Sequence, residues 1–93
     1  MPMPIDSPSR VLLITGASRG IGAVTALLAA ARGYAVCVNY RVNREAADAV
    51  VRDITRSGGA AIAVPGDVAV EADVMRLFQA CDEALGPLTA LVN

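Results

Sequence analysis

The sequence predicts an α/β fold in which helices cover both faces of a doubly wound parallel sheet. Short apolar runs alternate with helical segments of about 13–16 residues, which gives the order β-α-β-α-β-α-β. The apolar runs lack the polar–apolar alternation of a half-exposed strand, as expected for parallel strands buried on both faces. Right-handed crossovers between such strands place helices on both sides of the sheet.

The first strand is expected over residues 10–15, where an apolar run leads into a glycine-rich turn. A helix follows over residues 20–32, and Gly33 is a natural stop because glycine readily adopts the conformation found at helix ends. Apolar residues of this helix recur at helical spacing, as on the inner face of an amphipathic helix. They are Ile21, Val24, Leu27, Leu28 and Ala31.

The second strand is expected over residues 34–40. Asn43 then has the position of an N-cap, and Glu45 lies in the first helical turn, where the helix dipole favours a negative charge. This second helix is expected to run to about residue 57 and to end at a pair of glycines. Its inner stripe consists of Ala46, Ala47, Val50, Val51 and Ile54.

The third strand is expected over residues 60–64. A helix over residues 70–85 follows, with a poorly marked start because Ala69 stands where a Ser or Thr cap would be expected. A glycine and a proline end this helix, and a fourth strand is expected over residues 88–93. The apolar residues of the third helix have strongly amphipathic spacing and are Val74, Leu77, Phe78, Cys81 and Leu85.

Composition excludes several classes of function. The 93 residues form at most one small domain, and a net charge of −1 with no basic stripe argues against nucleic-acid binding. No apolar run approaches the roughly 20 residues of a membrane span and no secretory signal is visible, so we expect a cytoplasmic protein without membrane contact. Residues 1–9 are rich in proline and polar residues, and we expect them to be a flexible leader.

The sequence predicts no metal site. Histidine, the commonest metal ligand, is absent. The spacing of Cys37 and Cys81 matches no zinc-binding or redox motif. We therefore interpret both cysteines as small hydrophobic residues of the core.

The glycine-rich turn is the main functional signal of the sequence. Gly16, Gly20 and Gly22 follow a strand and open a helix, the arrangement in which backbone amides and the helix dipole face a dinucleotide diphosphate. The alternative is a turn that merely connects a strand to a helix. The run Thr15-Gly16-Ala17-Ser18-Arg19-Gly20-Ile21-Gly22 resembles the cofactor motif of the short-chain dehydrogenase/reductase family.

This resemblance extends over residues 10–93. It implies a Rossmann-type sheet with the strand order 3-2-1-4, and it implies that residues 10–93 are the N-terminal portion of an NAD(P)-binding domain, cut before the catalytic segment. Within the turn, the residues implied to bind the cofactor are Gly16, Ser18, Arg19, Gly20, Ile21 and Gly22.

The end of the second strand favours NADP as the cofactor. An acidic residue there would hydrogen-bond the ribose of NAD, whereas arginine accepts the extra phosphate of NADP. The sequence has Tyr40 and Arg41 at this place and no acid, and Arg19 could reach the same phosphate from the glycine turn. NAD is the alternative cofactor, and two solvated surface arginines are the alternative interpretation.

Two further cofactor contacts are implied by the resemblance alone. In the family, an Asp after the third strand bonds the adenine amino group and the next residue meets the ring; here these are Asp67 and Val68. A simple turn cap is the alternative role for Asp67. Asn93 matches the first Asn of the family's Asn-Asn-Ala-Gly segment, which lies near the adenosine ribose.

The sequence contains no catalytic residues of the family type. The family's Ser, Tyr and Lys follow the fifth strand, and neither Tyr34 nor Tyr40 has a Lys four residues later. The resemblance implies that the chain is the N-terminal part of an NADP(H)-dependent oxidoreductase, which transfers hydride between nicotinamide and a carbonyl or alcohol substrate. The resemblance also implies a homotetrameric or homodimeric parent protein. Alternatives are a non-catalytic nucleotide-binding module, a truncated product, or an interaction domain of flavodoxin-like topology.

Overall fold

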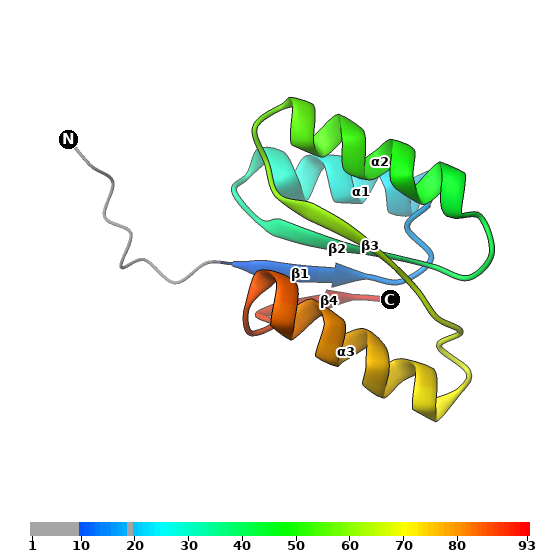
Figure 1. Ribbon diagram of the computed structural model, residues 1–93. Coiled ribbons are helices and arrows are strands. Elements are labelled where there is room, and N and C mark those ends of the chain that lie inside the picture. The colour runs from blue at the N-terminus through cyan, green and yellow to red at the C-terminus, as the bar shows by residue number, and fades with distance from the viewer. Residues whose placement is uncertain (1–9, 19) are drawn as a thin grey trace.

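The computed structural model describes residues 10–18 and 20–93 and shows a parallel sheet with helices on both faces (Figure 1). The expected leader over residues 1–9 and the expected phosphate contact of Arg19 lie outside the described residues. The strands are β1 (Val11–Ile14), β2 (Ala35–Tyr40), β3 (Ala61–Pro65) and β4 (Ala90–Val92). The helices are α1 (Gly20–Ala31), α2 (Arg44–Arg56) and α3 (Glu71–Leu85).

The sheet has the order β3-β2-β1-β4, and every neighbouring pair of strands is parallel. The predicted fold class and the predicted strand order are therefore confirmed. The observed ends of strands and helices fall within one or two residues of the predicted ends. Differences of this size are usual, because helix and strand ends fray.

The central strand explains why the apolar runs do not alternate. Residues Val11–Ile14 of β1 are all buried, because α1 and α2 cover one face of the sheet and α3 covers the other (Figure 1). Leu12 and Ile14 belong to the core cluster on the side of α1 and α2, and Leu13 packs with Leu77 of α3. Full burial of one such side chain stabilises the fold by about 1.5–3 kcal/mol.

The prediction of which residues of α1 face the core is wrong. All five residues expected on its inner face are exposed, Ile21 by 86% and Leu28 by 60%. The helix instead buries Ala26 and packs Ala23, Ala29 and Ala30 against the core. Small side chains let the helix axis lie close to the sheet, so the longer apolar residues are left on the outer side. Helical spacing alone identified an apolar face but not the face that is buried.

Helices α2 and α3 follow the predictions more closely. Asn43 caps α2 as expected, since its Oδ1 atom accepts a hydrogen bond of 3.0 Å from the Ala46 amide, and the stripe residues Ala47, Val50 and Ile54 are buried. The stripe of α3 is only partly buried: Leu77 and Cys81 face the core, but Phe78 is 43% exposed. None of the helices in the described residues combines the length and the hydrophobicity that a membrane span requires.

The start of α3 shows why its cap was hard to predict. Val70 occupies the N-cap position and makes no side-chain cap bond. Two acidic side chains order the preceding turn instead. The Asp67 carboxylate accepts the Ala69 amide at 2.9 Å, and the Asp73 carboxylate accepts the Asp67 amide at 2.9 Å.

Candidate functional site

The candidate site lies at the edge of the sheet where all four strands end. Parallel strands bring their carboxyl ends to the same edge, and ligands of open α/β sheets bind there. The glycine turn follows β1 at this edge and leads into the N-terminus of α1 (Figure 1). Arg41, Asp67 and Asn93 follow β2, β3 and β4 at the same edge. The topology therefore gathers the residues predicted from four separate stretches of sequence.

Each glycine of the turn has a physical reason to be glycine. Gly16 and Gly20 have φ angles of +62° and +67°, in the left-handed region that side chains disfavour. Gly22 has an ordinary helical backbone, but a Cβ atom there would lie 2.7 Å from the carbonyl oxygen of Gly16 and 2.9 Å from the Ala17 Cα. The first turn of α1 therefore packs directly on the backbone that follows β1.

The turn is fixed to the strands on both sides of β1. The Ala17 amide donates to the Asn39 carbonyl at 3.0 Å, and the Thr15 amide donates to the Val92 carbonyl at 3.0 Å. The Thr15 hydroxyl donates to Oδ1 of Asn93 at 2.9 Å. Asn93, predicted as a cofactor contact, thus supports the turn.

The N-terminus of α1 carries a partial positive charge that no acidic residue of its first turn neutralises. The first amides of a helix have no partner within the helix, and the helix dipole places partial positive charge there. The first turn of α1 carries no acidic residue. Ser18 is half-buried in the turn and Ile21 is exposed just inside the helix. The arrangement can hold an anionic group against backbone amides.

A hollow of about 380 Å³ lies between the loops that follow β2 and β3. Arginine and aspartate line it together, and the Arg76 guanidinium pairs with the Asp73 carboxylate. Val68, next to Asp67, is 49% exposed. The hollow is lined by both donors and acceptors of hydrogen bonds. Its lining residues are Arg41, Val42, Pro65, Gly66, Asp67, Asp73 and Arg76.

The side chains of Tyr40 and Arg41 lie in different environments, although the two residues are neighbours in sequence. The side chain of Tyr40 is only 7% exposed and belongs to the core cluster beneath α1 and α2. Its backbone carbonyl accepts the Gly66 amide at 2.9 Å. Arg41 is exposed at the mouth of the hollow. Of this predicted pair, the side chain that faces the candidate site is that of Arg41.

One residue of the site was missed in the sequence. Asn39, the residue before the end of β2, is 2% exposed and bonds to the segments that follow β1 and β3. The available signal was a polar side chain inside an apolar strand, because a buried amide needs partners for each of its polar atoms.

The cysteines are residues of the core, as predicted. Cys37 and Cys81 are free, buried and part of one cluster on the α3 side of the sheet. Burial, with the neighbouring Cys81 as a smaller cause, raises the pKa of Cys37 to about 12. Burial also raises the pKa of Cys81. Within the described part of the chain, no three metal-ligating side chains come together.

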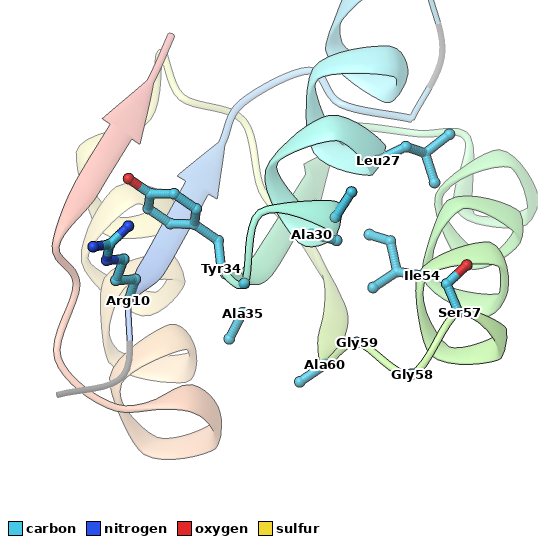
Figure 2. Close-up of a pocket in the computed structure, with 12 residues that line it drawn as sticks. Arg10, Leu27, Ala30, Tyr34, Ala35, Ile54, Ser57, Gly58, Gly59 and Ala60 are labelled. Atoms are coloured by element: carbon cyan, nitrogen blue, oxygen red, sulfur yellow. The ribbon is translucent and has the colours of Figure 1, made fainter. Parts of the chain in front are cut away.

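A larger pocket, of about 480 Å³, lies at the opposite edge of the sheet (Figure 2). Leu27, Ala30 and Ile54 line it beside the ends of α1 and α2, and the Arg10 guanidinium carbon lies 5.8 Å from the centre of the Tyr34 ring. This pocket contains none of the predicted site residues. It also lies at the amino ends of the strands, away from the edge where α/β sheets bind ligands.

Comparison with known proteins agrees with this geometry. The sequence model of the family described as short chain dehydrogenase matches residues 10–93. The chain belongs to this family. Membership confirms the resemblance seen in the glycine turn.

Two curated members of the family are close in sequence. The chain is 48% identical over 83 residues to "Uncharacterized oxidoreductase YgfF" of Escherichia coli (strain K12), covering 89% of this chain and 34% of that protein. It is 47% identical over 85 residues to a 3-oxoacyl-[acyl-carrier-protein] reductase of Synechocystis, covering 91% of this chain and 34% of that protein. The chain thus spans about a third of the length of the curated relatives that it matches.

A solved structure of the family has the same fold. A variant of a Serratia marcescens short-chain dehydrogenase/reductase superposes with a TM-score of 0.87 at 33% identity, covering 90% of this chain and 34% of that one. The parallel sheet and its strand order are therefore those of a short-chain dehydrogenase.

Proposed function

We propose that this chain is the dinucleotide-binding part of an NADP(H)-dependent oxidoreductase, which transfers hydride between nicotinamide and a carbonyl or alcohol substrate. The observation that carries the proposal is the glycine turn. Two of its glycines need the left-handed conformation, and the third admits a contact that any Cβ would block. Relatives named as an oxidoreductase and as a 3-oxoacyl-[acyl-carrier-protein] reductase support the reaction class.

The turn and the start of α1 would hold the diphosphate of the cofactor. Gly16 and Gly20 leave the backbone uncovered, and Gly22 lets the start of α1 pack on the turn. The amides of the first turn of α1 would supply donors together with the positive end of the helix dipole. Ser18 and Ile21 complete this segment, and Arg19 is proposed to add a positive charge. This segment would suit an anionic group that approaches the backbone atoms closely.

The hollow between the loops after β2 and β3 would hold the adenosine end. Arg41 would pair with the 2′-phosphate of NADP, and no acidic residue stands at the end of β2, where one would bond the ribose of NAD. Asp67 already caps the turn before α3 through one carboxylate oxygen. We propose that this carboxylate also accepts the adenine amino group, beside the backbone of Val68. Asn93 would lie near the adenosine ribose.

Catalysis of hydride transfer would need residues beyond the described site. When bound, the nicotinamide ring supplies or accepts the hydride. The sequence has 8 Lys and Arg residues, all of them arginine, and no histidine, so a lysine-assisted tyrosine is not available within it. The contribution of this chain is therefore to bind and orient the cofactor.

The direct test uses the product of the complete reading frame that contains this chain. NADPH and NADH are each titrated into it by calorimetry, and we expect NADPH to bind more tightly. A reading frame that continues with a Tyr-x-x-x-Lys segment would support the enzyme; a continuation without both residues would remove the oxidoreductase assignment. If neither saturating NADPH nor saturating NADH produces a detectable heat or fluorescence change, the binding assignment is wrong.

A further inference from the structure

We propose that Asn39 is a positioning residue for dinucleotide binding, because it joins the glycine turn to the loop that follows β3. This inference rests on the proposed function. Asn39 lies in β2, between the two loops, and its side chain is 2% exposed. Among the described residues, it is the only amide or charged side chain that is buried. It therefore acts through the loops and has no direct access to a ligand.

The hydrogen bonds of Asn39 reach both neighbouring strands. On the β1 side, its Oδ1 atom accepts the Gly16 amide at 3.4 Å, and its backbone carbonyl accepts the Ala17 amide at 3.0 Å. On the β3 side, its Nδ2 atom donates to the carbonyls of Val64 and Gly66, each at 3.2 Å. Nδ2 also lies 3.5 Å from the Tyr40 carbonyl. One side chain thus contacts the first residue of the glycine motif and the residue before Asp67.

The partners require an amide at this position. The β3 side offers only carbonyl oxygens, which need a donor, and the β1 side offers an N–H group, which needs an acceptor. A carboxylate supplies acceptors alone, and a leucine of similar shape supplies neither. The partners also fix the orientation of the amide, with Oδ1 toward the turn and Nδ2 toward the β3 loop.

Asn39 and its hydrogen-bond partners form a junction between the two loops that we propose to bind the cofactor. The glycine turn is the proposed diphosphate segment, and Gly66 precedes the residue proposed to contact adenine. A ligand that spans both segments binds best when their separation is already set, since ordering them on binding reduces affinity. Asn39 sets that separation from inside the sheet. Its loss leaves partly buried backbone groups without partners on both sides.

The test compares two variants with a control in the product of the complete reading frame. Asn39→Leu removes every side-chain bond at similar volume, and Asn39→Asp keeps the acceptor for Gly16 but loses the donors. Asn43→Ala is the control, because it removes the cap of α2, an asparagine that supports the fold and lies outside the junction. Calorimetric titration with NADPH gives the Kd and the stoichiometry, and thermal unfolding gives the midpoint of each protein.

We expect the Kd for NADPH to rise at least tenfold in Asn39→Leu and at least fivefold in Asn39→Asp, with a stoichiometry near one per chain. Asn43→Ala should lower the unfolding midpoint and keep the wild-type Kd. A purely structural role would lower the stoichiometry or the midpoint without changing the Kd of the folded molecules, and that result would overturn the inference.

The outcomes also separate this inference from the proposed function. Wild-type protein that binds neither NADPH nor NADH defeats the proposed function, and the inference falls with it. Wild-type protein that binds, with both Asn39 variants within twofold of its Kd, defeats the inference alone. If Asn39→Leu does not fold, Asn39→Asp decides by the same criterion, and failure of both to fold overturns the positioning role.

Discussion

Replacing Gly22 by alanine tests the close contact at the base of the glycine turn. The backbone of Gly22 is helical, so alanine brings no conformational strain there. Its Cβ, however, would lie 2.7 Å from the Gly16 oxygen and 2.9 Å from the Ala17 Cα. Both are backbone atoms, and the turn must move by several tenths of an ångström to admit the methyl group. Overpacking of this kind costs about 1–3 kcal/mol of stability.

The same movement should weaken cofactor binding. Hydrogen bonds from backbone amides to a charged group contribute about 1.5–3 kcal/mol each. Loss of one such bond raises the Kd by about 10-fold to 150-fold, since 1.4 kcal/mol corresponds to a factor of ten. We expect a change in this range when NADPH is titrated into Gly22→Ala in the product of the complete reading frame.

Gly59→Ala is the matched control for this experiment. A Cβ at Gly59 would lie 2.8 Å from the Cγ2 atom of Ile54, a comparable overlap that falls on a buried side chain near the opposite edge of the sheet. Both variants should lose stability, but only Gly22→Ala should lose affinity. Equal Kd values for NADPH in the two variants and the wild type would refute the proposed role of the turn.

Three further predictions concern other parts of the chain. Arg41→Ala should raise the Kd for NADPH about tenfold and leave the Kd for NADH within twofold, whereas Arg44→Ala, which loses an exposed ion pair with Asp48, should change neither. Because burial raises the pKa of Cys37 to about 12 from 9.0, the folded state holds this proton more tightly than the unfolded state. The stabilisation that comes from protonated Cys37 is fully present below pH 9 and should be lost as the pH rises toward 12. Cys37→Ala should therefore make the unfolding midpoint depend less on pH in this range. Leu28→Ser, on the exposed face of α1, should reduce the fluorescence of a bound hydrophobic dye. It should also lower the unfolding midpoint by less than Leu13→Ala does, because Leu13 lies in the core.

The fold was predictable because local signals agree with one another. Apolar runs without alternation identified buried parallel strands, and the Asn43 cap and the stripe of α2 fixed the second helix. The strand order came from the family resemblance, since helical and strand periodicity do not specify which strands are neighbours. The packing of α1 was not predictable by periodicity, because a helix of alanines and longer apolar residues has two apolar sides.

The site was predictable where backbone chemistry restricts the residue type. Gly16 and Gly20 adopt a conformation that strongly favours glycine, and Gly22 occupies a position without room for a side chain. Tyr40 and Asn39 show the limit of this reasoning. Neighbouring residues of a strand point to opposite faces, and their burial and partners depend on loops distant in the sequence. Only the structure shows that Asn39 joins two of these loops.

A crystal structure of the complete protein with NADPH would show whether the glycine turn binds the cofactor diphosphate. We expect the diphosphate to lie against the backbone of residues 16–22, with the adenosine end toward Arg41 and Asp67. The contradicting result would be NADPH bound elsewhere, such as in the pocket beside Arg10 and Tyr34, with the glycine turn empty in protein that is saturated with NADPH in solution.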